Sequence, residues 1–225
     1  MISVVIPSHN EEKVIEKVAR NMSKLFEKDE IIVVSNGCTD RTPEIVDRLN
    51  LKNVKHINIK ERIGKGGAVT EGFRCARGDI LGFIDADDAF RNEDILKVVE
   101  ETRKTDCVIA SKWKGRKFSD VDWPFVRKLA SRMANLFIRI LFGLNFSDTQ
   151  AGLKFFRRKV LGSIDMDFFC RGFEFDIELL YKIKKKGFEI REIWVPIKSK
   201  NTSTFSLFWM PAMGLNLLRL RFKLR

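Results

Sequence analysis

The chain has 225 residues, 44% of them hydrophobic and 32% charged, and its formal net charge is +12. This length and composition predict one α/β domain with a substantial core, and they exclude a low-complexity or disordered chain. The positive charge fits a nucleic acid, an anionic membrane or a phosphorylated substrate as the partner, and charge alone does not separate these classes.

The amino-terminal segment and the cysteines indicate a reduced, cytosolic protein. Residues 1–7 lack a basic region and a cleavage site, so we expect no signal peptide. The apolar stretches are interrupted before the ~20 residues that a membrane-spanning helix needs. Cys38, Cys75, Cys107 and Cys170 are widely spaced and form no CxxC pair, which argues against a zinc site or a disulfide framework.

Apolar runs separated by turn residues predict alternating strands and helices in the first half of the chain. The predicted strands cover 2–6, 30–34, 54–59, 79–84 and 106–111, and the predicted helices cover 13–26, 43–49, 64–76 and 92–104. This alternation predicts βαβ units and a mostly parallel sheet with right-handed crossovers. Ligands of such sheets bind beyond the carboxyl ends of the strands, so we expect the loops at 7–11, 34–40 and 85–88 to meet at one crevice.

The second half departs from this alternation. It is predicted to contain a long apolar helix at 123–143, a loop at 148–156 that leads into a strand, an amphipathic helix at 173–186 and a last strand at 189–196. No linker separates the two halves. We therefore interpret the second half as an acceptor-binding extension of the same domain.

The motif Asp85-Ala86-Asp87 follows the apolar run 80–84, which is predicted to be a buried strand. Two carboxylates at the carboxyl end of one strand can both reach one divalent cation. Mg²⁺ and Mn²⁺ prefer oxygen ligands and are commonly held by one or two carboxylates together with substrate phosphates. The motif therefore predicts an enzyme whose substrate carries a diphosphate, and the alternative is an acidic turn after a strand.

The carboxyl-terminal segment is basic and apolar. No acidic residue follows Glu192, and the basic residues at 219, 221, 223 and 225 alternate with Leu218, Leu220, Phe222 and Leu224 after an apolar stretch at 205–217. This pattern favours a segment lying on an anionic bilayer surface over binding to nucleic acid. The alternative is a terminal amphipathic helix packed on the core.

Several segments, in order along nearly the whole chain, resemble family 2 glycosyltransferases of the GT-A fold. The opening segment 4–11, the turn 31–42 and the Asp85-Ala86-Asp87 motif resemble the family in general. The segments 62–69, 148–156 and 173–180 are similar to its polyprenyl-phosphate sugar synthases, in particular the dolichyl-phosphate β-glucosyltransferase and mannose synthase branch.

The resemblance implies an α/β fold: a Rossmann-like, mostly parallel central sheet flanked by helices. This GT-A domain would cover 1–204, with 1–111 as the nucleotide-sugar half and 112–204 as the acceptor half. Residues 205–225 would form an amphipathic, membrane-associated helical segment.

The function that the resemblance implies is an inverting transfer of glucose or mannose from UDP-glucose or GDP-mannose to polyprenyl or dolichyl phosphate. The cofactor would be Mg²⁺ or Mn²⁺. The enzyme would bind peripherally to the anionic cytoplasmic face of the membrane, without a transmembrane helix and without a nucleic acid partner.

The resemblance also implies a set of donor-binding residues. Asp87 would bind the metal, and Asp85 would either bind it too or face the ribose. Lys65 stands at a helix start, where it could contact the diphosphate. The remaining donor residues implied are Pro7, His9, Glu11, Val33, Ser35, Asn36 and Ala86, although many relatives have an Asp pair where this chain has Ser35-Asn36.

The acceptor phosphate would be bound by Lys112, Arg127, Ser131 and Gln150, with Arg127 counted among the catalytic residues. A lipid phosphate is already ionised near neutral pH and needs no general base. A hydroxyl acceptor on a glycan or lipid-linked oligosaccharide would need a carboxylate base, for which Asp148, Glu174 and Asp176 are the candidates. The other functions considered are a nucleotidyltransferase and a non-catalytic binding module.

Overall fold

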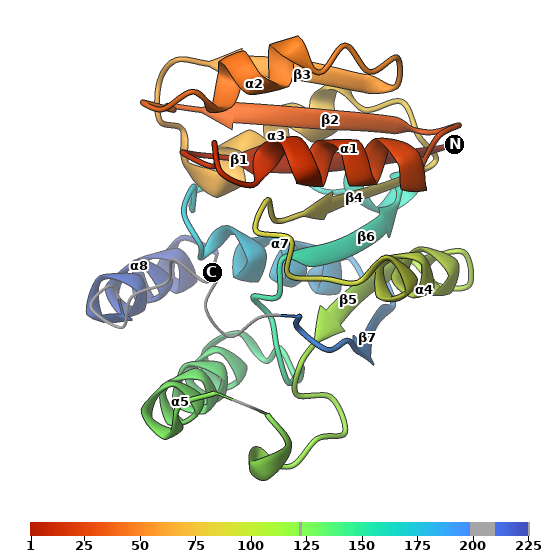
Figure 1. Cartoon of the computed structure of the whole chain (residues 1–225). Coiled ribbons are helices and arrows are strands. Elements are labelled where there is room, and N and C mark those ends of the chain that lie inside the picture. The colour runs from red at the N-terminus through yellow and green to blue at the C-terminus, as the bar shows by residue number, and fades with distance from the viewer. Residues whose placement is uncertain (122, 199–209, 225) are drawn as a thin grey trace.

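A seven-stranded sheet in the order β3-β2-β1-β4-β6-β5-β7 forms the centre of the computed structural model, which describes residues 1–121, 123–198 and 210–224 (Figure 1). The strands are β1 (Ile2–Ser8), β2 (Glu30–Asn36), β3 (Val54–Ile59), β4 (Ile80–Ile84), β5 (Cys107–Ser111), β6 (Leu153–Arg157) and β7 (Ile190–Trp194). Neighbouring strands are parallel except on the two sides of β6, which runs antiparallel to β4 and to β5.

Helices cover both faces of the sheet. They are α1 (Ile15–Leu25), α2 (Thr42–Arg48), α3 (Gly64–Cys75), α4 (Asn92–Thr102), α5 (Phe125–Phe142), α6 (Arg158–Gly162), α7 (Phe175–Lys185) and α8 (Met210–Lys223), with a 3₁₀ turn at Phe118–Asp120. Buried side chains of α1, α2 and α4 pack on one face, and those of α3, α5, α6, α7 and α8 belong to the core on the other.

The two cores explain why the central strands are apolar on both faces. In β2, Ile31 and Val33 point into one core, whereas Ile32 and Val34 point into the other, and all four are fully buried. A parallel strand with helices on both faces has no solvent side, so its sequence reads as an unbroken apolar run and not as an alternating one.

The fold predicted from the sequence is confirmed, with differences in detail. The expected strands and helices of the first half lie within about two residues of their observed ends. The direction of β6 and the short helix α6 were not predicted. Because β6 enters between β4 and β5, a strand of the second half lies beside the strand that ends just before Asp85.

Helices α5 and α8 lie side by side at the edge of the molecule, at the lower left of Figure 1. Leu217 and Leu220 of α8 are buried in the same core as Phe156 and Ile183. The predicted carboxyl-terminal amphipathic helix is therefore packed on the domain through one face. Of the predicted segment 205–225, residues 205–209 and 225 lie outside the described residues.

Every helix in the described residues falls short of the length or the hydropathy that a membrane-crossing segment requires.

Candidate active site

The Asp85-Ala86-Asp87 motif is held at the end of β4 by backbone contacts. The Asp85 amide donates to the Gly152 carbonyl at 2.8 Å, just beyond the β4–β6 ladder. A Cβ on residue 152 would lie 1.9 Å from Asp85 Oδ2, so only glycine permits this approach. Ala86 is buried in the core and directs the two flanking carboxylates away from it.

A cavity of about 370 Å³ opens beside Asp87. It is lined by Asn10, Glu11, Glu12, Lys13, Val14, Asp40 and Asp87. These residues come from the loops after β1, β2 and β4, which were expected to meet at one crevice. The geometry therefore brings the expected donor residues Glu11 and Asp87 together.

Two of the four carboxylates that line this cavity, Glu11 and Asp87, repel each other. Burial, followed by the charges of Asp87 and Asp85, raises the pKa of Glu11 to about 7. Burial and the charge of Asp85 likewise raise the pKa of Asp87 to about 6. Across the described part of the chain, neither group forms an ion pair with a lysine or arginine, so the cavity holds negative charge that the protein does not balance.

This unbalanced charge and the oxygen donor set fit a hard divalent cation such as Mg²⁺ or Mn²⁺. No three His, Cys, Asp or Glu side chains among the described residues cluster as a ready-made metal site. The fit is therefore to a cation held by Asp87 and Asp85 together with phosphate oxygens of a substrate, which is how Mg²⁺ is commonly bound.

Lys65 lies at the start of α3 and reaches the motif. Its Nζ is 2.8 Å from Asp85 Oδ1 and 3.3 Å from Asp176 Oδ2 of α7. Burial alone would lower the pKa of Lys65, but the charges of Asp176 and Asp85 together raise it, so the ammonium stays protonated. Lys65 is thus a fixed cation beside the site predicted for the diphosphate.

Asp88, the residue after the motif, is paired with two lysines. Lys17 and Lys198 lie 2.7 Å and 2.9 Å from its two carboxylate oxygens. Although burial acts to raise its pKa, the hydrogen bonds from these lysines lower the pKa of Asp88 overall. The carboxylate is already engaged as the bridge between two cations.

The turn after β2 is tied to β1 by hydrogen bonds. His9 Nδ1 lies 2.9 Å from the Asn36 carbonyl oxygen, and Asn36 Nδ2 donates to the Ser8 carbonyl at 3.1 Å. Asn36 Oδ1 is buried and has no hydrogen-bond partner in the described structure. It is therefore an acceptor that the described protein groups leave unsatisfied.

The other expected donor residues of β1 and β2 are structural neighbours of this turn. Pro7 and Val33 are buried, and Val33 belongs to the core below the turn. Ser35 is fully buried, and its Oγ lies 2.9 Å from His56 Nε2, whose ring also contacts Asp47. These side chains support the turn from below.

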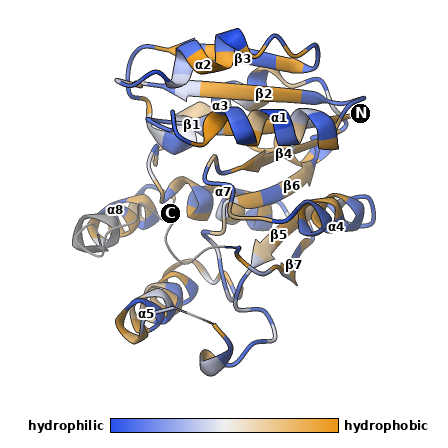
Figure 2. Cartoon of the chain, in the orientation of Figure 1, coloured by the Kyte–Doolittle hydropathy of each residue, from blue (hydrophilic) through white to orange (hydrophobic). Residues whose placement is uncertain are grey.

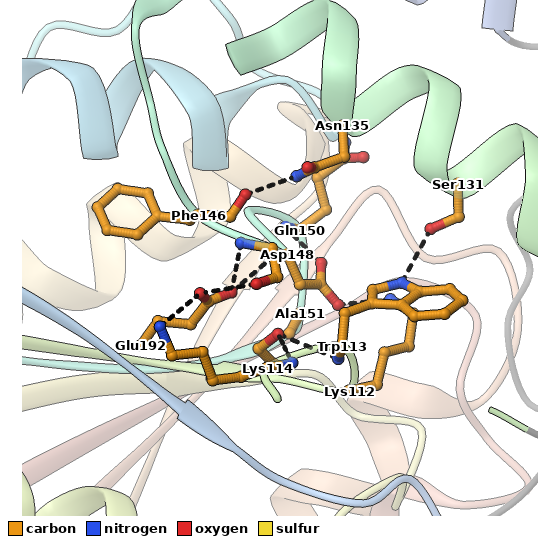
Figure 3. Close-up of polar contacts among 12 residues, drawn as sticks. Lys112, Trp113, Lys114, Ser131, Asn135, Phe146, Asp148, Gln150, Ala151 and Glu192 are labelled. Carbon is orange, nitrogen blue, oxygen red and sulfur yellow. Dashed lines mark hydrogen bonds and ion pairs between the residues drawn. The ribbon is translucent and has the colours of Figure 1, made fainter. Parts of the chain in front are cut away.

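Figure 3 shows three of the four residues expected to bind an acceptor phosphate, Lys112, Ser131 and Gln150, and the fourth, Arg127, lies in the first turn of α5. Lys112 Nζ pairs with Asp148 Oδ2 at 2.5 Å and also lies 4.8 Å from the centre of the Trp123 ring. The Arg127 guanidinium lies over the same ring at 4.1 Å. The structure thus brings these two cations together on one tryptophan.

Ser131 and Gln150 have partners of their own. Trp113 Nε1 donates to Ser131 Oγ at 3.3 Å, and Gln150 Nε2 donates to the Phe173 carbonyl at 3.4 Å. Figure 3 shows Ser131 projecting from α5 toward Trp113, next to Lys112 and Asp148. All four expected residues therefore belong to one polar region between α5 and the loop that precedes β6.

Sequence reasoning missed several members of this region. Trp123 lies against both Lys112 and Arg127, whereas Trp113 donates to Ser131 and its ring centre lies 5.3 Å from the Arg132 guanidinium. Glu192 of β7 accepts hydrogen bonds from the backbone amides of Ser147 and Asp148 at 2.7 and 2.8 Å. Glu192 fixes the loop that presents Asp148. No local sequence signal marks these roles, because each depends on contacts between distant segments.

Comparison with known proteins identifies the family. The model of the family described as Glycosyl transferase family 2 matches residues 3–165. The chain is a family 2 glycosyltransferase. This assignment confirms the resemblance seen in the sequence, including that of the Asp85-Ala86-Asp87 segment.

Curated relatives of this glycosyltransferase include enzymes that act on lipid-linked phosphates, according to their names. The chain is 31% identical over 216 residues to glycosyltransferase AglD of Haloferax volcanii, covering 92% of this chain and about a third (34%) of that protein. It is 30% identical to an undecaprenyl-phosphate mannosyltransferase of Micrococcus luteus, covering 85% of this chain and 81% of the relative. It is 28% identical to a dolichyl-phosphate beta-glucosyltransferase of Trichomonas vaginalis, covering 97% and 72%.

A solved structure similar to this glycosyltransferase is glucosyl-3-phosphoglycerate synthase from Mycobacterium tuberculosis, crystallised with Mn²⁺, UDP and glucosyl-3-phosphoglycerate. The TM-score is 0.74 at 23% identity, and the match covers 98% of this chain and 79% of the other. At this identity the likeness shows a shared GT-A-like fold.

The raised pKa values predict how the stability of the metal-free protein changes with pH. An unfolded Asp or Glu titrates near pH ~4, so between about pH 4 and about pH 7 the folded protein holds more protons on Asp87 and Glu11 than the unfolded chain does. Ionisation therefore lowers the free energy of unfolding as the pH rises. By calorimetry with a chelator, the double variant Glu11→Gln, Asp87→Asn should lose less stability between ~pH 5 and ~pH 8 than the unsubstituted protein.

The control for this prediction is Asp88→Asn. Because the pKa of Asp88 is lowered, its ionised form contributes stability above its unfolded pKa, and the variant should be less stable at ~pH 8. An unchanged pH dependence in the double variant would contradict the electrostatic account of the cavity.

Proposed function

We propose that the protein transfers glucose or mannose from a nucleotide diphosphate sugar to polyprenyl phosphate, with inversion, at the cytoplasmic face of a membrane. The proposal rests on the combination, in α5, of a cation at its first turn and an exposed apolar face. Its first turn contributes Arg127 to the cation pair on Trp123, and its outer face is apolar and exposed. A phosphate attached to a lipid chain would use both features.

The donor would occupy the cavity between the loops after β1, β2 and β4. Asp87 and Asp85 would hold Mg²⁺ or Mn²⁺, which when bound supplies charge neutralisation for the departing diphosphate. Lys65 and the amino end of α3 are placed to contact the same phosphates. Asn36 Oδ1, which has no partner in the described structure, would accept a hydrogen bond from the base, as from the imino group of uracil or guanine.

The acceptor phosphate would bind between Lys112 and Arg127. Arginine can donate two parallel hydrogen bonds to phosphate oxygens, whereas lysine acts as a point charge. As an ionised nucleophile, the phosphate needs orientation and no proton removal. Asp148 would hold Lys112 in place through the ion pair that is already present.

A hydroxyl acceptor is the second candidate, and the carboxylates that it would require are already engaged. Asp148 pairs with Lys112, and Asp176 pairs with Lys154 and Lys65. Glu174 Oε1 accepts a hydrogen bond from Asn216 of α8 at 3.1 Å. A general base must accept a proton from the nucleophile, so these pairings favour the phosphate acceptor.

The membrane contact would be made by α5 and α8. Figure 2 shows apolar and polar residues on both helices. Large apolar side chains are exposed on them at Phe125, Val126, Leu129, Met133, Leu136, Phe137, Ile140, Leu215, Leu218 and Phe222. Ile140 is 77% exposed, and Phe222 is 72% exposed. Exposed apolar surface of this extent marks an interaction site.

Basic residues accompany this surface, among them Arg132 and Arg139 on α5 and Arg219 and Lys223 on α8. Apolar insertion combined with basic residues is typical of helices that lie in the interface of an anionic bilayer. A basic residue near such a surface contributes ~1 kcal/mol of attraction. The same surface would keep the polyprenyl chain in the bilayer while its phosphate reaches Arg127.

The proposed reaction is tested by transfer into an organic phase. Protein with Mn²⁺ or Mg²⁺ is incubated with radiolabelled UDP-glucose, GDP-mannose or UDP-N-acetylglucosamine, with and without a short polyprenyl phosphate. Label should enter the organic phase only with the lipid phosphate, from UDP-glucose or GDP-mannose. Asp87→Ala should lower the rate ~100-fold or more, and Glu93→Ala, at an exposed carboxylate of α4, should not. Donor binding without transfer to lipid would refute the acceptor assignment.

The role of Arg127 separates the two acceptor classes. Arg127→Ala should raise the KM for polyprenyl phosphate about 10-fold or more, because a hydrogen bond to a charged group is worth ~1.5–3 kcal/mol. Arg127→Lys should recover part of the loss, since it keeps the charge and loses the paired geometry. Loss of activity in Glu174→Gln, with Arg127→Ala near normal, would point to a hydroxyl acceptor.

Membrane binding is tested by sedimentation with vesicles that contain phosphatidylglycerol. Met133→Glu and Ile140→Glu should each weaken binding about 10-fold, since burying a large aliphatic side chain is worth ~1.5–3 kcal/mol. Leu96→Glu is the matched control, because Leu96 is exposed and its helix, α4, lies on the other side of the molecule from α5 and α8 in Figure 1. Equal weakening by all three substitutions would contradict the assignment of this surface.

A further inference from the structure

Four charged side chains of alternating sign form a chain that leads from the metal motif into the core. Lys65 Nζ lies 2.8 Å from Asp85 Oδ1 and 3.3 Å from Asp176 Oδ2. Lys154 Nζ lies 2.6 Å from the other oxygen of Asp176 and donates to the Ala151 carbonyl at 2.6 Å. The order is therefore Asp85, Lys65, Asp176 and Lys154.

The inner end of this chain is sealed from water. Lys154 is 0% exposed and Asp176 is 1% exposed. Lysine is almost never fully buried unless it is paired, because removing its charge from water is costly. Phe83 of β4, which pairs in register with Lys154, lies beneath both ammonium groups at 5.2 Å from Lys65 and 5.3 Å from Lys154.

The backbone is shaped to bring these four groups together. Lys65 stands at the amino end of α3, and Asp176 at the amino end of α7, where a carboxylate is favoured by the helix dipole. A Cβ on Gly66 would lie 2.6 Å from the side chain of Phe175. The starts of α3 and α7 are therefore packed too closely for any residue other than glycine at position 66. Lys154 comes from β6, the strand inserted beside β4.

Asp176 has an electrostatic effect on Asp85. Without the Asp176 carboxylate, the ammonium of Lys65 would be attracted to Asp85 alone and would compete there with a metal ion. With Asp176 in place, the ammonium lies between two carboxylates. Lys154 balances the charge of Asp176 in a place where water cannot.

We propose that Asp176 and Lys154 are positioning residues of the donor site: together they hold Lys65 beside the diphosphate position while leaving Asp85 available to the metal–nucleotide complex. Outer partners of this kind orient the groups that touch a metal or its ligand, and their loss weakens metal affinity ~10- to ~100-fold. The inference rests on the proposed donor site and is independent of which acceptor is used.

The test measures nucleotide binding, so it does not depend on transfer to lipid. UDP and GDP are each titrated into the protein with saturating Mn²⁺ by calorimetry, and the thermal midpoint is recorded for every variant. Asp176→Asn should weaken binding of the preferred nucleotide ~10-fold or more. Lys65→Arg should retain most of the affinity, because it preserves the cation between the two carboxylates.

Glu178→Gln is the matched control. Glu178 is on the same helix and is as buried as Asp176. Its contacts are with Lys182 and with the backbone amides of Phe169 and Cys170, and they lie outside the chain of charges that reaches Asp85. It should lower the thermal midpoint and leave the nucleotide affinity unchanged. A structural defect of α7 would instead weaken binding in both variants.

A double variant separates a loss of nucleotide affinity from a loss of stability. Lys154→Met leaves the buried Asp176 without the nearer of its two lysine partners and should be unstable, whereas Lys154→Met with Asp176→Asn removes both charges and should recover thermal stability. Its nucleotide affinity should stay at the level of Asp176→Asn. Recovery of normal affinity in the double variant, or normal affinity in folded Asp176→Asn, would overturn the proposal, as would failure of the unsubstituted protein to bind either nucleotide.

Discussion

The pairing of β4 with β6 is the constraint on which the candidate site depends. β6 belongs to the second half of the chain, yet it lies antiparallel beside β4, the strand that ends just before Asp85. The hydrogen bond from the Asp85 amide to the Gly152 carbonyl continues this pairing into the Asp85-Ala86-Asp87 motif. The loop before β6 carries Asp148 and Gln150 of the proposed acceptor region. The residues proposed to bind donor and acceptor are therefore positioned by one strand pair, and a shift in its register would move both sets.

Charge within the site is distributed unequally. Two lysines, Lys65 and Lys154, balance Asp85 and Asp176 in the interior. Asp87 and Glu11 are left without such a partner in the described structure, and their pKa values are raised accordingly. Balanced charges keep the interior stable, whereas the unbalanced pair creates an attraction for a divalent cation. A cation brought in with a nucleotide diphosphate would relieve the repulsion, which links metal binding to donor binding.

Most of the fold could be predicted from the sequence because buried parallel strands have apolar sequences bounded by turn residues. The sequence also located Asp85 and Asp87, since position at a strand end is a local property. It did not predict the direction of β6, because the order of strands along the chain does not determine their order in the sheet.

Lys154 was missed as a site residue for a similar reason. A lysine within a strand is normally expected at the surface, and its burial here depends on Asp176 from a helix over twenty residues away. The pairing of Lys112 with Asp148 likewise depends on the contact between two segments that are far apart in the sequence.

The central claim is that Asp85 and Asp87 form a cation site completed by the phosphates of a nucleotide. The most direct test is a titration of Mn²⁺ followed by electron paramagnetic resonance, with and without UDP or GDP. We predict weak Mn²⁺ binding to the protein alone, tightened ~10-fold or more by one of the nucleotides and abolished in Asp87→Asn. Mn²⁺ binding that is equally strong without nucleotide, or that survives in Asp87→Asn, would contradict the account.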